Sequence, residues 1–249
     1  MELEVVISLT LLIFVAALLY SSVGHAGASG YLAAMALFGL APMEMKPAAL
    51  ALNILVASIS TTKYVRAGCF SWKIFWPFAL ASVPFAYVGG YINVPSIYYK
   101  PIVGVALIYA AWRFIKDANV SDYAIKKPKI IWIVTYGAGL GFMSGLTGVG
   151  GGIFLSPLLI FLRWADVKQV SGVAAAFILV NSIAGLLGFL ATKTPQLPDA
   201  LPIWAIAAVI GGFIGAEYGS KRFGNPTIKK LLAIVLLVAG IKMIATAYY

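Results

Sequence analysis

The 249-residue chain has few of the side chains on which most enzyme and metal sites depend. It contains one cysteine, Cys69, and one histidine, His25, which excludes an internal disulfide framework and a His-pair metal site. Only 10% of the residues are charged, and Asp and Glu together number 8. This leaves no cluster for zinc or iron and no evident carboxylate pair for acid–base catalysis. We therefore expect no metal, no cofactor and no catalytic residue.

The chain is unusually rich in apolar residues. It is 62% hydrophobic, with a mean hydropathy of +0.97, whereas a soluble domain is about half apolar and a quarter charged. The apolar runs are continuous, so they do not alternate as the strands of a membrane barrel do. The composition predicts an all-α polytopic membrane protein.

Ten apolar stretches divide the chain. Most are close to the roughly 20 helical residues that cross a hydrocarbon core. Two are too short, since 11 residues such as 31–41 reach only about half way at roughly 1.5 Å per residue. The stretches are 4–20, 31–41, 48–62, 72–92, 101–115, 130–143, 153–162, 170–191, 201–218 and 228–247.

The sequence contains an internal repeat. The glycine-rich segment Ser21 to Leu32 aligns with Ser144 to Leu155, and three further apolar segments follow each. We predict two inverted-topology repeats, each a glycine-broken helical hairpin plus three transmembrane helices, with 8 to 10 segments in all. The first repeat would span 1–118, a cytoplasmic linker 119–129, and the second repeat 130–249.

The basic residues predict the orientation. With the amino terminus outside and both arms of each hairpin on one side, fourteen of the 18 Lys and Arg residues fall in inner loops. The exceptions are Lys46, Lys100, Lys193 and Lys242. The net charge of +10 is then a topology signal and not a sign of nucleic-acid binding. The two loops would enter from opposite sides and meet near the midplane, and rocking of one half against the other would expose this centre to each side in turn.

The paired loops predict an anion site. Glycines allow tight turns and close approach of backbone N–H groups, and a helix that starts after each loop directs its positive end at the ligand. No Asp or Glu lies in either loop, which disfavours a cation site. Close helix packing is the alternative role for any single glycine. The candidate substrate-binding residues are Ser21, Ser22, Gly24, His25, Gly27, Ser29, Gly30, Asn53, Ser144, Thr147, Gly148, Gly150, Gly151, Gly152 and Asn181.

The titratable side chains near the loops and helix ends allow different roles. His25 would donate to the anion or carry a proton with it, or it would support the loop as a neutral, hydrogen-bonded side chain. Glu217 and Lys221 are spaced for an i, i+4 ion pair. Lys63 and Arg66 would attract anions to an inner mouth or set the topology.

Several motifs resemble the TauE/SafE sulfite exporter family over nearly the whole chain. They are the doubled glycine hairpin, Ala-Leu-Ala-Leu-Asn53, Tyr64-Val-Arg-Ala-Gly68, Val88-Gly-Gly90 and Val180-Asn-Ser-Ile-Ala-Gly185. The resemblance implies a multi-pass permease of the bacterial or archaeal inner membrane that exports sulfite or related sulfur or organic anions. The first loop departs from the second by having His25 and fewer glycines.

We predict a secondary transporter that moves a small anion such as sulfite by alternating access. The bilayer and the anion are its expected partners, and the oligomeric state stays open. An anion channel and a proton-coupled uptake permease are the alternatives. An intramembrane Ser–His enzyme is disfavoured, because no acid partner for His25 is evident.

Overall fold

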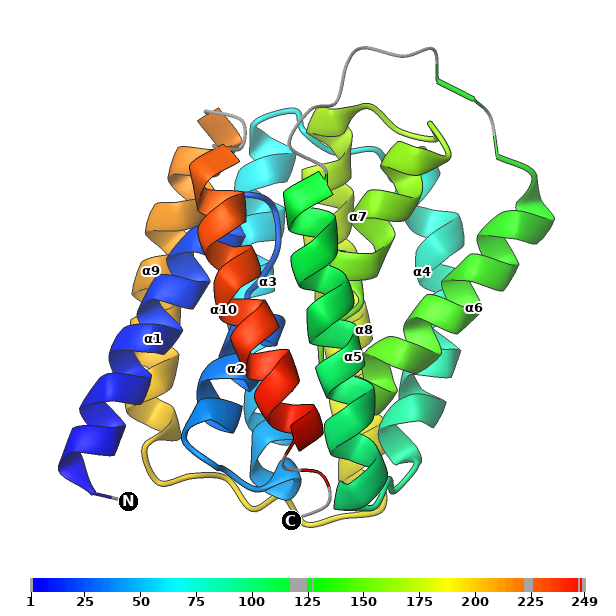
Figure 1. Ribbon diagram of the computed structural model, residues 1–249. Coiled ribbons are helices and arrows are strands. Elements are labelled where there is room, and N and C mark those ends of the chain that lie inside the picture. The colour runs from blue at the N-terminus through cyan, green and yellow to red at the C-terminus, as the bar shows by residue number, and fades with distance from the viewer. Residues whose placement is uncertain (1, 117–124, 127, 222–225, 246, 248–249) are drawn as a thin grey trace.

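The computed structural model describes residues 2–116, 125–126, 128–221, 226–245 and 247, and the regular structure of these residues is helical (Figure 1). This confirms the predicted all-α class. Residue 118 and most of the predicted linker 119–129 lie outside the described residues. The ten described helices are α1 (Leu3–Ser21), α2 (Ala28–Leu37), α3 (Pro42–Arg66), α4 (Trp72–Tyr91), α5 (Ser96–Lys116), α6 (Ile130–Thr147), α7 (Gly152–Phe161), α8 (Val167–Leu190), α9 (Leu201–Lys221) and α10 (Pro226–Ala245).

Two helices begin five or more residues earlier than the hydrophobic pattern indicates. Helix α3 starts at Pro42 and not at residue 48, and α5 starts at Ser96 and not at residue 101. Proline is tolerated near the start of a helix, where a missing N–H removes little hydrogen bonding. The Glu44 carboxylate also accepts from the backbone N–H of Ala41 at 3.2 Å. As a result Lys46, which the sequence assigned to a connector, lies inside α3.

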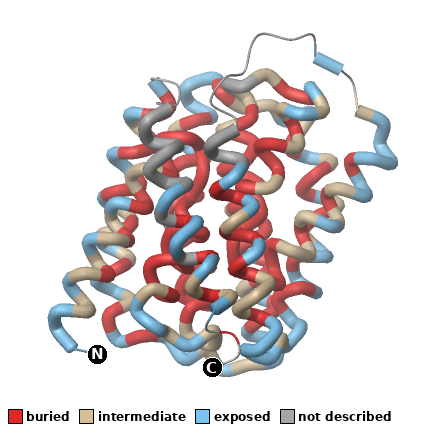
Figure 2. The backbone as a smooth tube through the Cα atoms, viewed as in Figure 1, coloured by how far each residue is buried: buried red, intermediate tan, exposed pale blue. Residues whose placement is uncertain are grey.

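Six of the described helices, α1, α3, α4, α6, α8 and α9, are long and apolar enough to cross a membrane. Helices α2 and α7 have 10 residues each and are the short arms that the sequence predicted. Buried residues concentrate in the interior of the bundle and exposed ones on its outside (Figure 2). The outward residues include Leu3, Ile7 and Leu11, which are 74%, 59% and 61% exposed. A continuous apolar exterior of this kind is suited to lipid.

The helices run between two ends of the bundle (Figure 1). Both chain termini lie at one end, here called the terminal end. The end of α5 and the start of α6 lie at the other, here called the linker end. The α1–α2 hairpin enters from the terminal end and returns to it, whereas the α6–α7 hairpin enters from the linker end and returns there. Both short helices begin about half way along the bundle.

Helices from the two halves of the sequence are interleaved. Helix α4 packs against α6 and α8, while α9 packs against α1 and α3. We call α1, α2, α3 and α9 the α3 bundle, and α4, α6, α7 and α8 the α8 bundle. Helices α3 and α8 contact each other between the bundles, and α5 pairs with α10. Neither bundle therefore corresponds to one half of the sequence.

Glycines make close packing possible within each bundle. A Cβ on Gly141 of α6 would lie 2.2 Å from the backbone oxygen of Ser82 on α4. A Cβ on Gly215 of α9 would lie 2.0 Å from the backbone oxygen of Leu18 on α1. Small residues at helix contacts allow this approach in membranes. For these glycines, packing is the role that the geometry supports.

A pair of alanine substitutions on α6 tests this packing. Gly141→Ala should destabilise the protein by about 1–3 kcal/mol, because the backbone of α4 cannot move away freely. Gly139→Ala is the control: a Cβ there meets no atom within 4 Å among the described residues, so stability should hold or rise by up to about 1 kcal/mol. Thermal unfolding in detergent measures both. Equal effects of the two substitutions would contradict the close contact.

Candidate functional site

The first break in the backbone follows α1. The backbone N–H of His25 donates to the oxygen of Tyr20 at 2.9 Å, and Gly24 adopts a left-handed φ of 78°. This is the usual way for a helix to end on glycine. Gly27, with φ 108°, then precedes the first residue of α2.

The second break follows α6 in a similar way. Gly148 ends the helix with φ 80°, and its N–H donates to the oxygen of Ser144 at 2.9 Å. Gly150 and Gly151 also have positive φ, 83° and 79°, before α7 begins at Gly152. Residues 20–36 and 144–153, which contain the two breaks, are buried throughout.

The backbone C=O groups at the breaks have side-chain hydrogen-bond partners, whereas the backbone N–H groups at the starts of the short helices have none among the described residues. On the carbonyl side, the Tyr64 hydroxyl donates to the oxygen of Ser21 at 3.1 Å, and the Tyr99 hydroxyl donates to the oxygen of Thr147 at 2.8 Å. On the N–H side, no described side chain caps the start of α2 or α7. The acceptors are thus satisfied, while buried N–H donors and the positive ends of two helices remain available to an anion.

The turns lie at opposite ends of the bundle. A Cβ on Gly24 would lie 2.5 Å from the backbone of Ser171, near the start of α8 at the linker end. Gly148 instead faces Lys46, near the start of α3 at the terminal end, where its Cβ would lie 3.2 Å from Cγ.

The predicted meeting of the two turns at the midplane is therefore wrong. Asn53 and Ser182 share one depth, because Asn53 Nδ2 donates to Ser182 Oγ at 3.3 Å. Lys46 and Ser171 lie seven and eleven residues from them in opposite directions, so the turns are roughly 27 Å apart along the bundle at about 1.5 Å per residue. The long arms α1 and α6 carry each turn to the far side, and the non-helical return brings the short helix back to the middle.

The centre of the bundle gathers part of the predicted site. A Cβ on Gly150 would lie 2.7 Å from Asn53 Nδ2 and 3.1 Å from Ser182 Oγ. Asn181, next to Ser182, donates from Nδ2 to the oxygen of Phe177 at 2.8 Å. The Oδ1 atoms of Asn53 and Asn181 are buried and lack a hydrogen-bond partner in the described part of the chain. The loop between α6 and α7 thus meets α3 and α8, the helices that contain Asn53 and Asn181, at this point.

Hydroxyl groups divide into two classes. The Oγ atoms of Ser21 and Ser144, which align in the repeat, are buried without a partner among the residues described. Ser22 Oγ donates to the oxygen of Leu19 at 2.7 Å, and Thr147 Oγ1 donates to that of Met143 at 2.7 Å. The first pair is available for a ligand, and the second pair serves the helix ends.

Three further predicted residues lie at the starts of the short helices. Ser29 is buried in the first turn of α2. Gly30 packs against α1, since its Cβ would lie 2.8 Å from the Cβ of Ala16. Gly152 packs against Ile178 of α8 at 2.4 Å by the same measure. For Gly30 and Gly152, helix packing is the role that the contacts support.

His25 joins the two bundles at the linker end. Its Nδ1 lies 3.2 Å from the oxygen of Val23, and its Nε2 lies 3.2 Å from Ser156 Oγ on α7. A neutral ring with the proton on Nδ1 would satisfy both contacts. The geometry favours the supporting role for His25.

The sequence analysis did not identify Lys46, Ser156 or Ser182 as site residues. Lys46 is buried at 4% exposure, and its Nζ donates to the oxygens of Gly89 and Gly90 at 3.4 and 3.3 Å. It therefore places a cation beside the second loop at the last turn of α4. Its position as a lysine in a largely apolar stretch was the feature of the sequence that pointed to Lys46.

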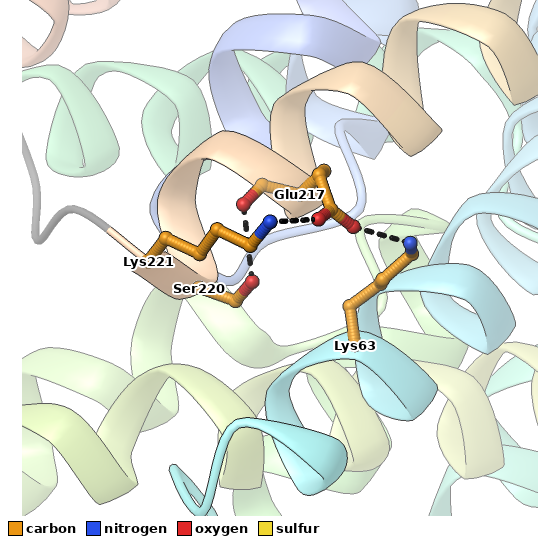
Figure 3. A network of polar contacts seen from close by, with 4 residues as sticks. All are labelled: Lys63, Glu217, Ser220 and Lys221. Atoms are coloured by element: carbon orange, nitrogen blue, oxygen red, sulfur yellow. Dashed lines mark hydrogen bonds and ion pairs between the residues drawn. The ribbon is translucent and has the colours of Figure 1, made fainter.

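An ion pair joins α3 to α9 at the linker end, and a second one lies within α9 (Figure 3). Lys221 Nζ contacts Glu217 Oε1 at 2.5 Å, which confirms the predicted i, i+4 pair, and Lys63 of α3 contacts Glu217 Oε2. Lys63 is thus paired with a carboxylate that it shares with Lys221. Tyr64 points into the protein toward Ser21. These contacts favour a structural role for Lys63 and Tyr64.

A corresponding contact holds α8 to α4 at the terminal end. Lys193, just after α8, donates to Asn93 Oδ1 at 2.5 Å, and Thr192 Oγ1 donates to the oxygen of Tyr91 at 3.2 Å. Partial burial lowers the pKa of Lys193. Each bundle therefore has a polar contact that joins two of its own helices.

Comparison with known proteins identifies the family of the chain. The family model for the sulfite exporter TauE/SafE matches residues 9–243. The chain belongs to the TauE/SafE family. The TauE/SafE chain is therefore a membrane transporter, and its family is one of transporters and not of enzymes.

Relatives in this family carry transporter names. A probable membrane transporter protein of Sinorhizobium fredii is 39% identical over 242 residues, which cover 96% of this chain and 98% of the relative. One of Methanocaldococcus jannaschii is 27% identical over 198 residues, covering 75% and 73%. No solved structure matches the chain significantly.

Removing one tyrosine hydroxyl tests how the second break is stabilised. Tyr99→Phe should cost about 1–3 kcal/mol of stability, because the buried Thr147 carbonyl loses its donor. Tyr109→Phe on the exposed side of the same helix is the control and should change little. Thermal unfolding in detergent compares them, and equal stability of both variants would show that the bond is unimportant.

Proposed function

We propose that this TauE/SafE protein is a secondary transporter that exports a small oxyanion such as sulfite by alternating access around a site in the middle of the bundle. One observation carries the proposal: at both breaks the buried carbonyls have tyrosine donors, whereas the starts of α2 and α7 lack side-chain caps among the described residues. Such a site is rich in donors and suits a negative charge.

The proposed site has neutral and cationic components. Backbone N–H groups at Gly27, Gly150 and Gly151 would contact the anion. The hydroxyl of Ser144, which lies beside Gly151, would join them, and the hydroxyl of Ser21 would line the path to the site from the linker end. Asn53 Oδ1 and Asn181 Oδ1 would accept a hydrogen bond from the O–H group of a singly protonated anion or, with the amide rotated, the Nδ2 group would donate one to the anion. The remaining predicted residues would shape the loops. Lys46 would add positive charge on the terminal side.

Two inverted repeats, 1–118 and 130–249, would generate this site. The opposite directions of the two hairpins in Figure 1 support the relation. So does the exchanged packing, in which α4 contacts α6 and α8 as α9 contacts α1 and α3. In such folds substrate sites form where the repeats meet.

The moving bodies would be the α3 bundle and the α8 bundle and not the two halves of the sequence. Contacts between these bundles exist at both ends. At the linker end, His25 meets Ser156. At the terminal end, Lys46 meets the carbonyls of Gly89 and Gly90. Breaking one set while the other persists would open the site to one side at a time.

The orientation follows from the charges. With the terminal end outside, the linker end with Lys63, Arg66, Lys73 and Lys129 faces the cytoplasm of a bacterial or archaeal cell. An inside-negative potential then favours export of an anion by about 2.3 kcal/mol per charge at 100 mV.

Sulfite flux into liposomes tests the proposed function. Radiolabelled sulfite should show saturable uptake and counterflow, with competition by sulfate, thiosulfate and lactate defining the substrate class. Asn53→Ala should lower the transport efficiency by about tenfold or more, since a hydrogen bond to a charged ligand is worth about 1.5–3 kcal/mol. Ser58→Ala, exposed on the same helix, is the control. Flux that rises linearly without counterflow would instead identify a channel.

Thiol labelling tests the two gates in a Cys69→Ala background. Lys46→Gln should speed labelling of Ser144→Cys from the terminal side, and Ser156→Ala should speed labelling of Ser21→Cys from the linker side. Each substitution removes a contact between the bundles at one end. Lys221→Gln and Lys193→Gln remove contacts within one bundle and should leave both rates unchanged. If either gate variant sped labelling from both sides equally, general loosening would replace the gating account.

A further inference from the structure

A cavity lies at the linker end, away from the proposed transport site. It has a volume of about 520 Å³ and lies where the chain enters α6 and leaves α7. Lys126, Lys129 and Arg163 supply three basic side chains to its lining, while Trp132 and Trp164 supply aromatic walls. No acidic residue belongs to the described lining. The cavity therefore combines positive charge with amphipathic rings.

Arg163 adopts a backbone conformation that favours glycine. Its φ is 58°, and it follows α7 in a turn closed by a hydrogen bond from the N–H of Trp164 to the oxygen of Leu159, 2.9 Å. Glycine usually occupies this position at the end of a helix. A strained residue at such a place suggests that its side chain has a use.

The backbone also joins the two sides of the cavity. The N–H of Lys126 donates to the oxygen of Arg163 at 2.7 Å, which places the segment before α6 against the α7–α8 turn. Two basic side chains from distant parts of the sequence are thereby held at the same cavity. This arrangement is a formed site and not a scatter of surface charge.

The surroundings indicate a lipid. Ile130 and Ile131, at the start of α6, are 66% and 61% exposed, and Phe161, at the end of α7, is 76% exposed. Apolar helix faces therefore begin directly beside the cationic cavity. Tryptophan and basic residues gather at the level of lipid headgroups in membrane proteins. A ligand with a phosphate in the cavity and acyl chains on these faces would match both the basic lining and the apolar surface beside it.

We propose that this cavity binds the headgroup of an anionic phospholipid, with Lys126, Lys129 and Arg163 contacting the phosphate and the acyl chains lying along α6 and α7. The site requires that the protein be embedded in a membrane but not that it transport sulfite, so the two proposals fail independently.

Titration of the delipidated protein by native mass spectrometry tests the site. Dioleoylphosphatidylglycerol should bind more tightly than dioleoylphosphatidylcholine. Lys126→Gln and Lys129→Gln should each weaken phosphatidylglycerol binding about fivefold, as expected for one basic residue near an anionic headgroup. Lys73→Gln is the matched control, because it removes the same charge at the same end, outside the cavity lining, and should leave the dissociation constant unchanged.

Arg163→Gly separates strain from binding. It should raise the thermal stability of the lipid-free protein, because glycine accepts the positive φ, while weakening phosphatidylglycerol binding like the lysine variants. Equal binding of the two lipids, or an equal loss in Lys73→Gln, would overturn the proposal. So would glycerol phosphate that binds alone as tightly as the lipid, since the ligand would then be a soluble phosphate.

Discussion

The structure depends on the constraint that broken backbone inside a membrane must be satisfied by the protein. Two buried breaks, at Gly24 to Gly27 and Gly148 to Gly151, interrupt helices that would otherwise need no outside partner. Tyrosines from α3 and α5 supply donors to the carbonyl ends, and left-handed glycines allow the turns. The backbone N–H groups at the starts of α2 and α7 are the exception, because no described side chain caps them. The proposed function derives from this difference between satisfied acceptors and available donors.

Glycine has two separate functions in this chain. Those with positive φ at the breaks shape a place where backbone and ligand can meet. Those within helices, such as Gly141 and Gly215, bring helix backbones into contact. The second group also decides which helices pack together, because α4 is bound to α6 and α9 to α1. Each of the two bundles therefore combines helices from both halves of the sequence.

Much of the fold could be predicted because long apolar runs and helices coincide. The hairpins were predicted from the short runs after the glycines, and the Glu217–Lys221 pair from its spacing. The depth of the turns was not, although the full length of α1 and α6 already implied it. Lys46 was missed because Pro47 interrupts the apolar pattern, so that a charge beside it looked like part of a connector. Ser156 and Ser182 were missed because their partners, His25 and Asn53, are distant in sequence.

Because the packing is interleaved, some polar contacts lie within one bundle whereas others join the two bundles. Lys63 and Glu217 join helices of one bundle, as Lys193 and Asn93 do in the other, so both pairs would persist while the bundles move. Lys46 and His25 instead contact the opposite bundle, at opposite ends. The Lys46 amino group donates to two carbonyls at the long distances of 3.3 and 3.4 Å and lies 5.7 Å from the centre of the Phe189 ring. An arriving anion offers Lys46 a stronger partner than those carbonyls. Substrate charge could thus release the terminal gate directly, which would couple binding to opening without a separate carboxylate.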